Sequence, residues 1–90
     1  MKDFISVKQA AEVTGYDSAS LHKQLEADLN NNRQSIPCVR CGNHILVVLR
    51  TFAQMILGIE YNVPEKLANW LIKWHLATDE EIDEILKEAS

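Results

Sequence analysis

Residues 5–52, ISVKQAAEVTGYDSASLHKQLEADLNNNRQSIPCVRCGNHILVVLRTF, carry an ordered series of secondary-structure signals. A short helix is predicted over Val7–Thr14, and Gly15 breaks it. Asp17 is placed to accept hydrogen bonds from the free backbone N–H groups that open a second helix. A β-hairpin is predicted over Ile36–Val48, and a third helix follows it. The expected fold is therefore mostly α with one small β-hairpin.

The first two predicted helices each have one apolar face at helical spacing. These faces are formed by Val7, Ala10, Ala11 and Thr14 in the first helix and by Leu21, Leu25 and Leu29 in the second. Ser6 is expected to cap the first helix, and Gly15 is expected to take the positive φ that ends it. The opposite face of the second helix is small, polar and accessible, and it carries Ser20, Lys23, Gln24 and Ala27.

The dipeptide Gly42-Asn43 predicts a two-residue turn, which fixes the register of the hairpin. The expected pairs are Cys41 with His44, Arg40 with Ile45, Val39 with Leu46, and Cys38 with Val47. Apolar residues near the base indicate that the hairpin packs into the domain there. Its tip, formed by Arg40, Gly42, Asn43 and His44, is polar and expected to be exposed.

The chain after the hairpin predicts three more helices. In the first, Thr51 is a candidate cap, the buried side is expected to hold Phe52, Met55 and Ile56, and Gly58 ends the helix. Pro64 is well placed in the first turn of the next helix. A capping box at Thr78-Asp79-Glu80-Glu81 opens the last one, whose apolar stripe is Ile82, Ile85, Leu86 and Ala89.

The helix that begins at Pro64 is apolar around most of its circumference, with Leu67, Ala68, Trp70, Leu71, Ile72, Trp74 and Leu76. Such a helix needs cover on more than one side, and the stripe of the last helix covers only one. We therefore expect a homodimer through this helix, with an interface of Leu67, Trp70, Leu71 and Trp74. Residues 1–58 and 59–90 are expected to be a front part and a helical extension of one compact domain, the extension packing on the front part or forming the dimer interface.

Ninety residues correspond to one domain with a small core. No apolar run approaches the roughly 20 residues of a membrane span, and the first residues lack the apolar segment of a signal peptide, so we expect a cytoplasmic protein. The net charge is −4, which does not favour a general nucleic-acid binder. It is unevenly placed: residues 1–57 have six Lys and Arg against five Asp and Glu, whereas residues 58–90 have three lysines against eight carboxylates. This asymmetry predicts two surfaces with different roles.

The order of motifs over about the first 57 residues resembles the excisionase-type DNA-binding domains, which are relatives of the MerR-type winged helices. The matching residues are Ser6-Val7, Ala10-Ala11, Gly15, Asp17 with Leu21, Ile36-Pro37, Val39-Arg40, Gly42-Asn43 and Ile45-Leu46-Val47. Two features differ from the family pattern. Residues 26–35 are several positions longer than usual, and Ser18 stands where the family often has a basic residue.

The resemblance implies a winged helix-turn-helix and double-stranded DNA as the partner, for a phage or mobile-element protein that serves as an excisionase or a small transcriptional regulator. The start of the second helix would enter the major groove, with Ser18, Ala19, Ser20, His22 and Lys23 nearest the bases. Arg40, Asn43 and His44 would reach the backbone or minor groove. Lys8 and Arg50 would hold phosphates, which positions a protein without reading sequence.

Two other functions stay open. A small terminase subunit also joins a winged helix-turn-helix to helical assembly segments. A protein–protein adaptor would keep the fold and bind no DNA; Ser18 and the acidic C-terminal helices, as a surface for a protein partner, favour it. The sequence contains no paired nucleophile and base and no phosphate-binding glycine loop, so we expect no enzyme and no cofactor.

Cys38 and Cys41 have the spacing of half a zinc knuckle, and His44 is close. Zinc sites normally need four N or S ligands, and the sequence has no second cysteine pair. Residues three apart in a regular strand also point to opposite faces. We therefore expect two structural cysteines and no metal.

Overall fold

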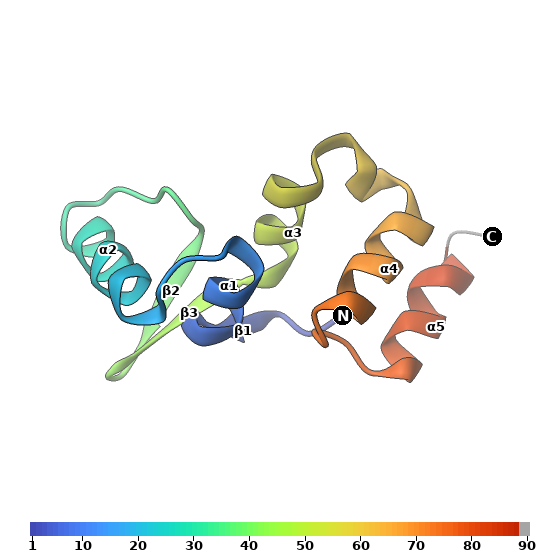
Figure 1. Ribbon diagram of the computed structural model, residues 1–90, viewed down its shortest axis with the longest axis horizontal. Coiled ribbons are helices and arrows are strands. Elements are labelled where there is room, and N and C mark those ends of the chain that lie inside the picture. Colours follow the sequence, from blue (N-terminus) through green and yellow to red (C-terminus); the bar gives the residue numbers. More distant parts are fainter. Residues whose placement is uncertain (89–90) are drawn as a thin grey trace.

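A three-stranded antiparallel sheet lies at the middle of the computed structural model, which describes residues 1–88 (Figure 1). The strand order is β1–β3–β2, with β1 at Phe4–Ser6, β2 at Cys38–Cys41 and β3 at His44–Val48. The pairing of β2 with β3 confirms the predicted register, from Cys38 opposite Val47 to Cys41 opposite His44. Strand β1 was not predicted, because three residues are too few to show a strand period.

Two capped helices follow β1 and are joined by a tight turn. Helix α1 spans Val7–Thr14, and Ser6 caps it in a capping box with Gln9. Gly15 ends α1 at φ 80°, as predicted. Helix α2 spans Ser18–Asn30, and a carboxylate oxygen of Asp17 accepts a hydrogen bond from the backbone N–H of Ser20 at 3.0 Å.

Helix α3, Leu49–Leu57, begins directly at the end of β3. The prediction that Thr51 caps it was wrong, because Val48 occupies the cap position and Thr51 lies inside the helix. The predicted buried side was only partly right. Phe52 is buried, whereas Met55 and Ile56 are 52% and 45% exposed. After the cap residue Gly58, the chain continues as a 3-10 helix, η1, over Gly58–Asn62.

Helices α4, Pro64–Lys73, and α5, Asp79–Glu88, pack against each other at the other end of the molecule from α2 (Figure 1). Pro64 is in the first turn of α4 as predicted. The predicted capping box of α5 is also present: Thr78 N–H donates to Glu81 Oε1 at 3.0 Å, and Glu81 N–H donates to Thr78 Oγ1 at 3.2 Å. Ile82 of the predicted α5 stripe is buried and Ile85 half-buried, whereas Leu86 is exposed. Ala89 lies outside the described residues.

Most of the α4 residues that were expected to form a dimer interface are buried within the single chain. Leu67, Trp70 and Leu71 are buried, and Trp74 is half-buried with the Lys73 ammonium over its ring. Trp70 meets the ring of Phe52, with 6.2 Å between the ring centroids. The prediction that these side chains form a dimer surface was therefore wrong at Leu67, Trp70 and Leu71, because α5, η1 and Phe52 of α3 supply the cover that α4 needs.

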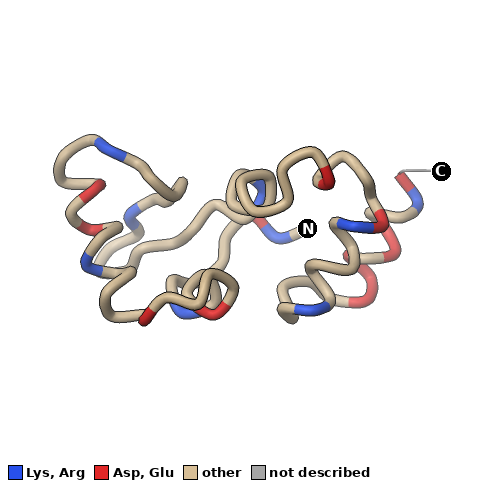
Figure 2. Tube along the Cα trace, turned by 45° about the horizontal axis from the view of Figure 1, so that its top comes forward, with Lys and Arg blue, Asp and Glu red and all other residues tan. Residues whose placement is uncertain are grey.

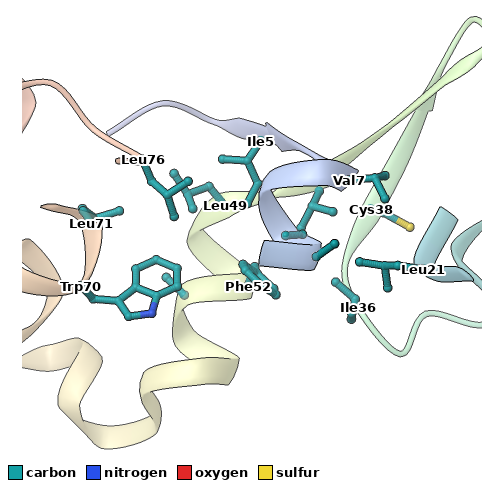
Figure 3. Close-up of a cluster of buried hydrophobic side chains, with 14 of the residues drawn as sticks. Ile5, Val7, Leu21, Ile36, Cys38, Leu49, Phe52, Trp70, Leu71 and Leu76 are labelled. Carbon is teal, nitrogen blue, oxygen red and sulfur yellow. The ribbon is translucent and has the colours of Figure 1, made fainter. Parts of the chain in front are cut away.

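One hydrophobic core joins the two ends of the elongated molecule, whose extents are 42 × 23 × 22 Å. Figure 3 shows it running from Leu71 and Trp70 past Phe52 to Cys38 and Leu21. Residues 1–58 and the described part of 59–90 thus share a core. Among residues 1–88, none of the helices combines the length and apolar character that a membrane crossing requires.

Candidate nucleic-acid interface

The outer face of α2 is exposed at one end of the molecule (Figure 1). Leu21 and Leu25 are buried beneath the helix, while Ala19, Lys23 and Ala27 point away from that side. Helix α1 packs against α2 and contributes the buried pair Ala10-Ala11 to the core. The helix therefore presents a small, polar surface to a partner.

The first turn of α2 is shaped by its cap. Ser18, Ala19 and Ser20 are all exposed there. The Ser20 hydroxyl donates to the carboxylate of Asp17 at 3.2 Å, so this hydroxyl is engaged in the cap. Ser18 and Ala19 present short side chains that allow close approach of a partner to the backbone.

The side of α2 that faces the hairpin carries His22 and Glu26. His22 is half-buried, and its Nδ1 lies 4.0 Å from a carboxylate oxygen of Glu26, one turn further on. This pair is ionic only when the imidazole is protonated. The His22 side chain is 41% exposed, so it stays accessible beside Glu26.

The hairpin tip lies beside α2 and is tied to it. The Arg40 guanidinium donates to Asn30 Oδ1, at the last residue of α2, over 3.1 Å. A hollow of about 130 Å³ lies between the helix and the tip, lined by Glu26, Arg40, Gly42, Asn43, His44 and Ile45. The structure thus brings Arg40, Asn43 and His44 together at the hairpin tip, as predicted, and places them next to α2 with a carboxylate that the prediction left out.

The loop between α2 and β2 folds back on the helix. The Ser35 hydroxyl donates to the Asp28 carboxylate at 2.7 Å, and Gln24 donates to the same hydroxyl at 3.3 Å. The loop carries Arg33, whose backbone N–H donates to the Asp28 carbonyl at 2.7 Å. Arg33 is exposed and brings a third cation to this end of the molecule. Sequence reasoning missed it, although it is the only charged residue among 29–39.

Arg50 lies elsewhere. It lies in the first turn of α3 and lines a hollow of about 300 Å³ with Met1, Tyr61, Pro64, Leu67, Glu84, Ile85 and Glu88. The carboxylates of this hollow belong to the acidic helix α5. The structure therefore does not bring Arg50 into the hollow beside α2. Lys8 is exposed on α1, with Glu12 one turn further along the same helix.

The charges of the two ends differ in arrangement, as Figure 2 shows. Carboxylates gather along α5, which has three acidic residues in its first turn. The α2 end mixes both signs. Its cations are Lys23, Arg33 and Arg40, and its carboxylates are Asp17, Glu26 and Asp28. The α2 end is therefore the less acidic of the two, and its charge is balanced.

The two cysteines face opposite sides of β2, as predicted: Cys38 is buried and Cys41 is exposed. Burial raises the pKa of the Cys38 thiol, and the Asp28 carboxylate raises it further. Cys38 therefore remains a protonated core side chain. Within residues 1–88, no three His, Cys, Asp or Glu side chains gather in a group that could hold a metal ion.

Comparisons with protein-family models, with curated proteins and with solved structures found no match for this chain.

Proposed function

We propose that this chain binds double-stranded DNA, with the first turns of α2 at the major groove and the hairpin tip on the backbone or minor groove. The observation that carries the proposal is the exposed outer face of α2 with the tip tied beside it by the bond between Arg40 and Asn30. The order α1, turn, α2, hairpin supports a winged helix-turn-helix, the arrangement to which the sequence is similar. The role is that of an excisionase or small transcriptional regulator.

Each part of this end has a place in the mechanism. The short side chains of Ser18 and Ala19 allow the helix to approach the base edges of the groove closely. Lys23 lies about one turn further along α2. Asn43 and His44 at the tip supply hydrogen-bonding groups. Lys23, Arg40 and the added Arg33 neutralise phosphates. Arg50 has no part in this surface, because it lines a hollow with carboxylates of α5.

The balance of three cations and three carboxylates determines how tightly the chain is expected to bind DNA. Few phosphate contacts give weak binding that decreases steeply with salt. Glu26 lies in the hollow beside Arg40 and opposes a phosphate there. The same two observations favour the second candidate function, an adaptor that uses α2 and the hairpin tip to bind a protein.

Selection from a pool of randomised duplexes at low salt separates the two functions. The DNA proposal expects an enriched sequence and a fluorescence-anisotropy signal that falls with salt. Lys23→Ala should reduce the slope of log affinity against log salt by about one. Lys66→Ala is the matched control, because it removes the same charge from α4 and should leave the slope unchanged. No enrichment and no anisotropy change at low salt would reject DNA binding and leave the adaptor.

A further inference from the structure

Arg50 is an exposed cation for which the proposed DNA surface has no use. In the part of the chain that the structure describes, its guanidinium has neither an ion-pair partner nor a hydrogen-bond partner. It shares a hollow with Glu84 and Glu88 of α5, yet it pairs with neither of them. Its N–H donors are therefore available to an acceptor from outside the chain.

Arg50 lies between two hollows of about 300 Å³ each. One is the hollow described above, which reaches α4 and α5. The other lies at the end of the sheet, and its lining residues are Met1, Lys2, Asp3, Phe4, Val48, Arg50 and Thr51. Met1 and Arg50 line both hollows, so the two spaces meet at this pair of residues. We call the two hollows together the Arg50 groove.

Each hollow of the Arg50 groove also has an apolar part. At the sheet, Phe4 and Val48 lie opposite each other on β1 and β3, close enough for their side chains to form one surface, and Phe4 is 42% exposed. At the other hollow, Leu67 is buried and Ile85 is half-buried. Figure 1 shows the N-terminal segment running from β1 toward α4 and α5. The Arg50 charge therefore has apolar surface on both sides.

We propose that the Arg50 groove binds an extended peptide in which one Asp or Glu lies between two apolar residues. In an extended chain, side chains two positions apart point to the same side. The carboxylate can then meet the guanidinium while the apolar side chains two positions before and after it enter the two hollows. Arg pairs with a carboxylate through two parallel N–H···O bonds, which selects this group over a neutral one. An elongated ligand is required, because the apolar surfaces belong to separate hollows.

The charges around the Arg50 groove give the peptide a direction. Glu84 and Glu88 lie one turn apart on α5 and attract a Lys or Arg at that end of the peptide. At the other end, Lys2 and Asp3 balance each other. A nucleic acid fits less well, because its phosphates would also meet the carboxylates of α5. None of the residues that line the groove belongs to α2 or to the hairpin tip, so the proposal is independent of DNA binding.

Selection on the full chain from a displayed library of random peptides tests the proposal. A length of about nine residues, roughly 30 Å when extended, allows the peptide to reach both hollows. We expect an enriched motif with one Asp or Glu and an apolar residue two positions away on each side. A fluorescein-labelled peptide with this motif should bind in anisotropy titrations. Arg50→Ala should raise its dissociation constant about tenfold or more, because charge-assisted hydrogen bonds are lost.

Arg33→Ala is the matched control, because it removes the same charge from an exposed position at the other end of the molecule and should leave the dissociation constant unchanged. Arg50→Lys should restore only part of the affinity, since Lys keeps the charge but lacks the planar fork. Arg50 is exposed in a helix, which alanine favours, so Arg50→Ala keeps the fold.

Two results would overturn the proposal directly: no enriched motif, or equal dissociation constants for Arg50→Ala and the unchanged protein. A third result would assign the groove to another ligand. If octanoate alone shifts the amide NMR signals of Phe4 and Val48 while no peptide is enriched, the hollows take a small carboxylate and the peptide proposal is wrong. Each of these measurements is made without DNA, so the proposed function is tested separately.

Discussion

Substituting Leu25 by alanine tests whether both ends of the elongated molecule unfold together. Leu25 is completely buried beneath α2. The two tryptophans of the chain, Trp70 and Trp74, lie at the other end, in α4 and at its C-terminus. Their fluorescence therefore reports on a region that Leu25 does not belong to. Because one core connects the two regions, the loss of stability caused by Leu25→Ala should shift the unfolding transition that tryptophan fluorescence reports.

The expected cost follows from complete burial. A fully buried Leu→Ala change lowers the free energy of unfolding by about 2–5 kcal/mol. A domain of 90 residues has a total of roughly 5–13 kcal/mol, so the variant stays folded if its stability is not at the lower limit. With a urea dependence of about 1–3 kcal/mol per molar, the midpoint should fall by roughly 1–5 M.

Urea titrations followed by tryptophan fluorescence and by far-ultraviolet circular dichroism provide the measurement. Both signals should shift by the same amount in Leu25→Ala. Leu86→Ala, at a 40% exposed position of α5, is the control and should cost less than about 1 kcal/mol. If the fluorescence midpoint stays in place while circular dichroism shows an earlier transition, α2 unfolds independently and the reasoning from a shared core is refuted.

Three smaller tests address the cysteines, the cap of α2 and the acidic end. An aromatic disulfide reagent should modify Cys41 in the folded protein and Cys38 only after unfolding, because Cys38 is buried and its pKa is raised. Equal rates of modification at the two thiols of the folded protein would contradict this. Asp17→Ala should lower the free energy of unfolding by about 1 kcal/mol and the melting temperature by about 4–8 °C. An unchanged melting temperature would show that the Asp17 cap does not stabilise the protein. The pKa of Glu81 is lowered mainly by the hydrogen bond from the Thr78 backbone, so its stabilising effect is present above the unfolded pKa and is lost as the pH falls through the folded one. The difference in melting temperature between the unchanged protein and Glu81→Gln should therefore shrink below about pH 4, and a difference independent of pH would show that the charge is irrelevant.

Local signals in the sequence predicted the elements best. The caps at Ser6, Asp17 and Thr78 depend on side chains three residues away, and all three are present. The register of the hairpin follows from Gly42-Asn43 alone and is also confirmed. These features need no knowledge of the tertiary structure, because their partners lie within one turn of the chain.

Features that depend on distant partners were harder to predict. Strand β1 exists because Phe4–Ser6 meets β3, more than 40 residues away, and its three residues show no period of their own. Trp70 looked like an interface residue because the sequence cannot show that Phe52 meets it. Nothing in the neighbourhood of Arg50 along the chain shows the hollow that it shares with Glu84, away from α2.

The balanced charge of the α2 end bears directly on the proposed DNA binding. One copy offers three cations against three carboxylates there, so a complex of the proposed kind neutralises few phosphates and is expected to be weak. If two copies are joined in one assembly, binding of the second end is intramolecular and gains effective concentration without any new contact, provided that the two ends reach half-sites on one face of the duplex. We therefore expect a duplex with two half-sites to be bound more tightly than one with a single half-site only where two copies associate.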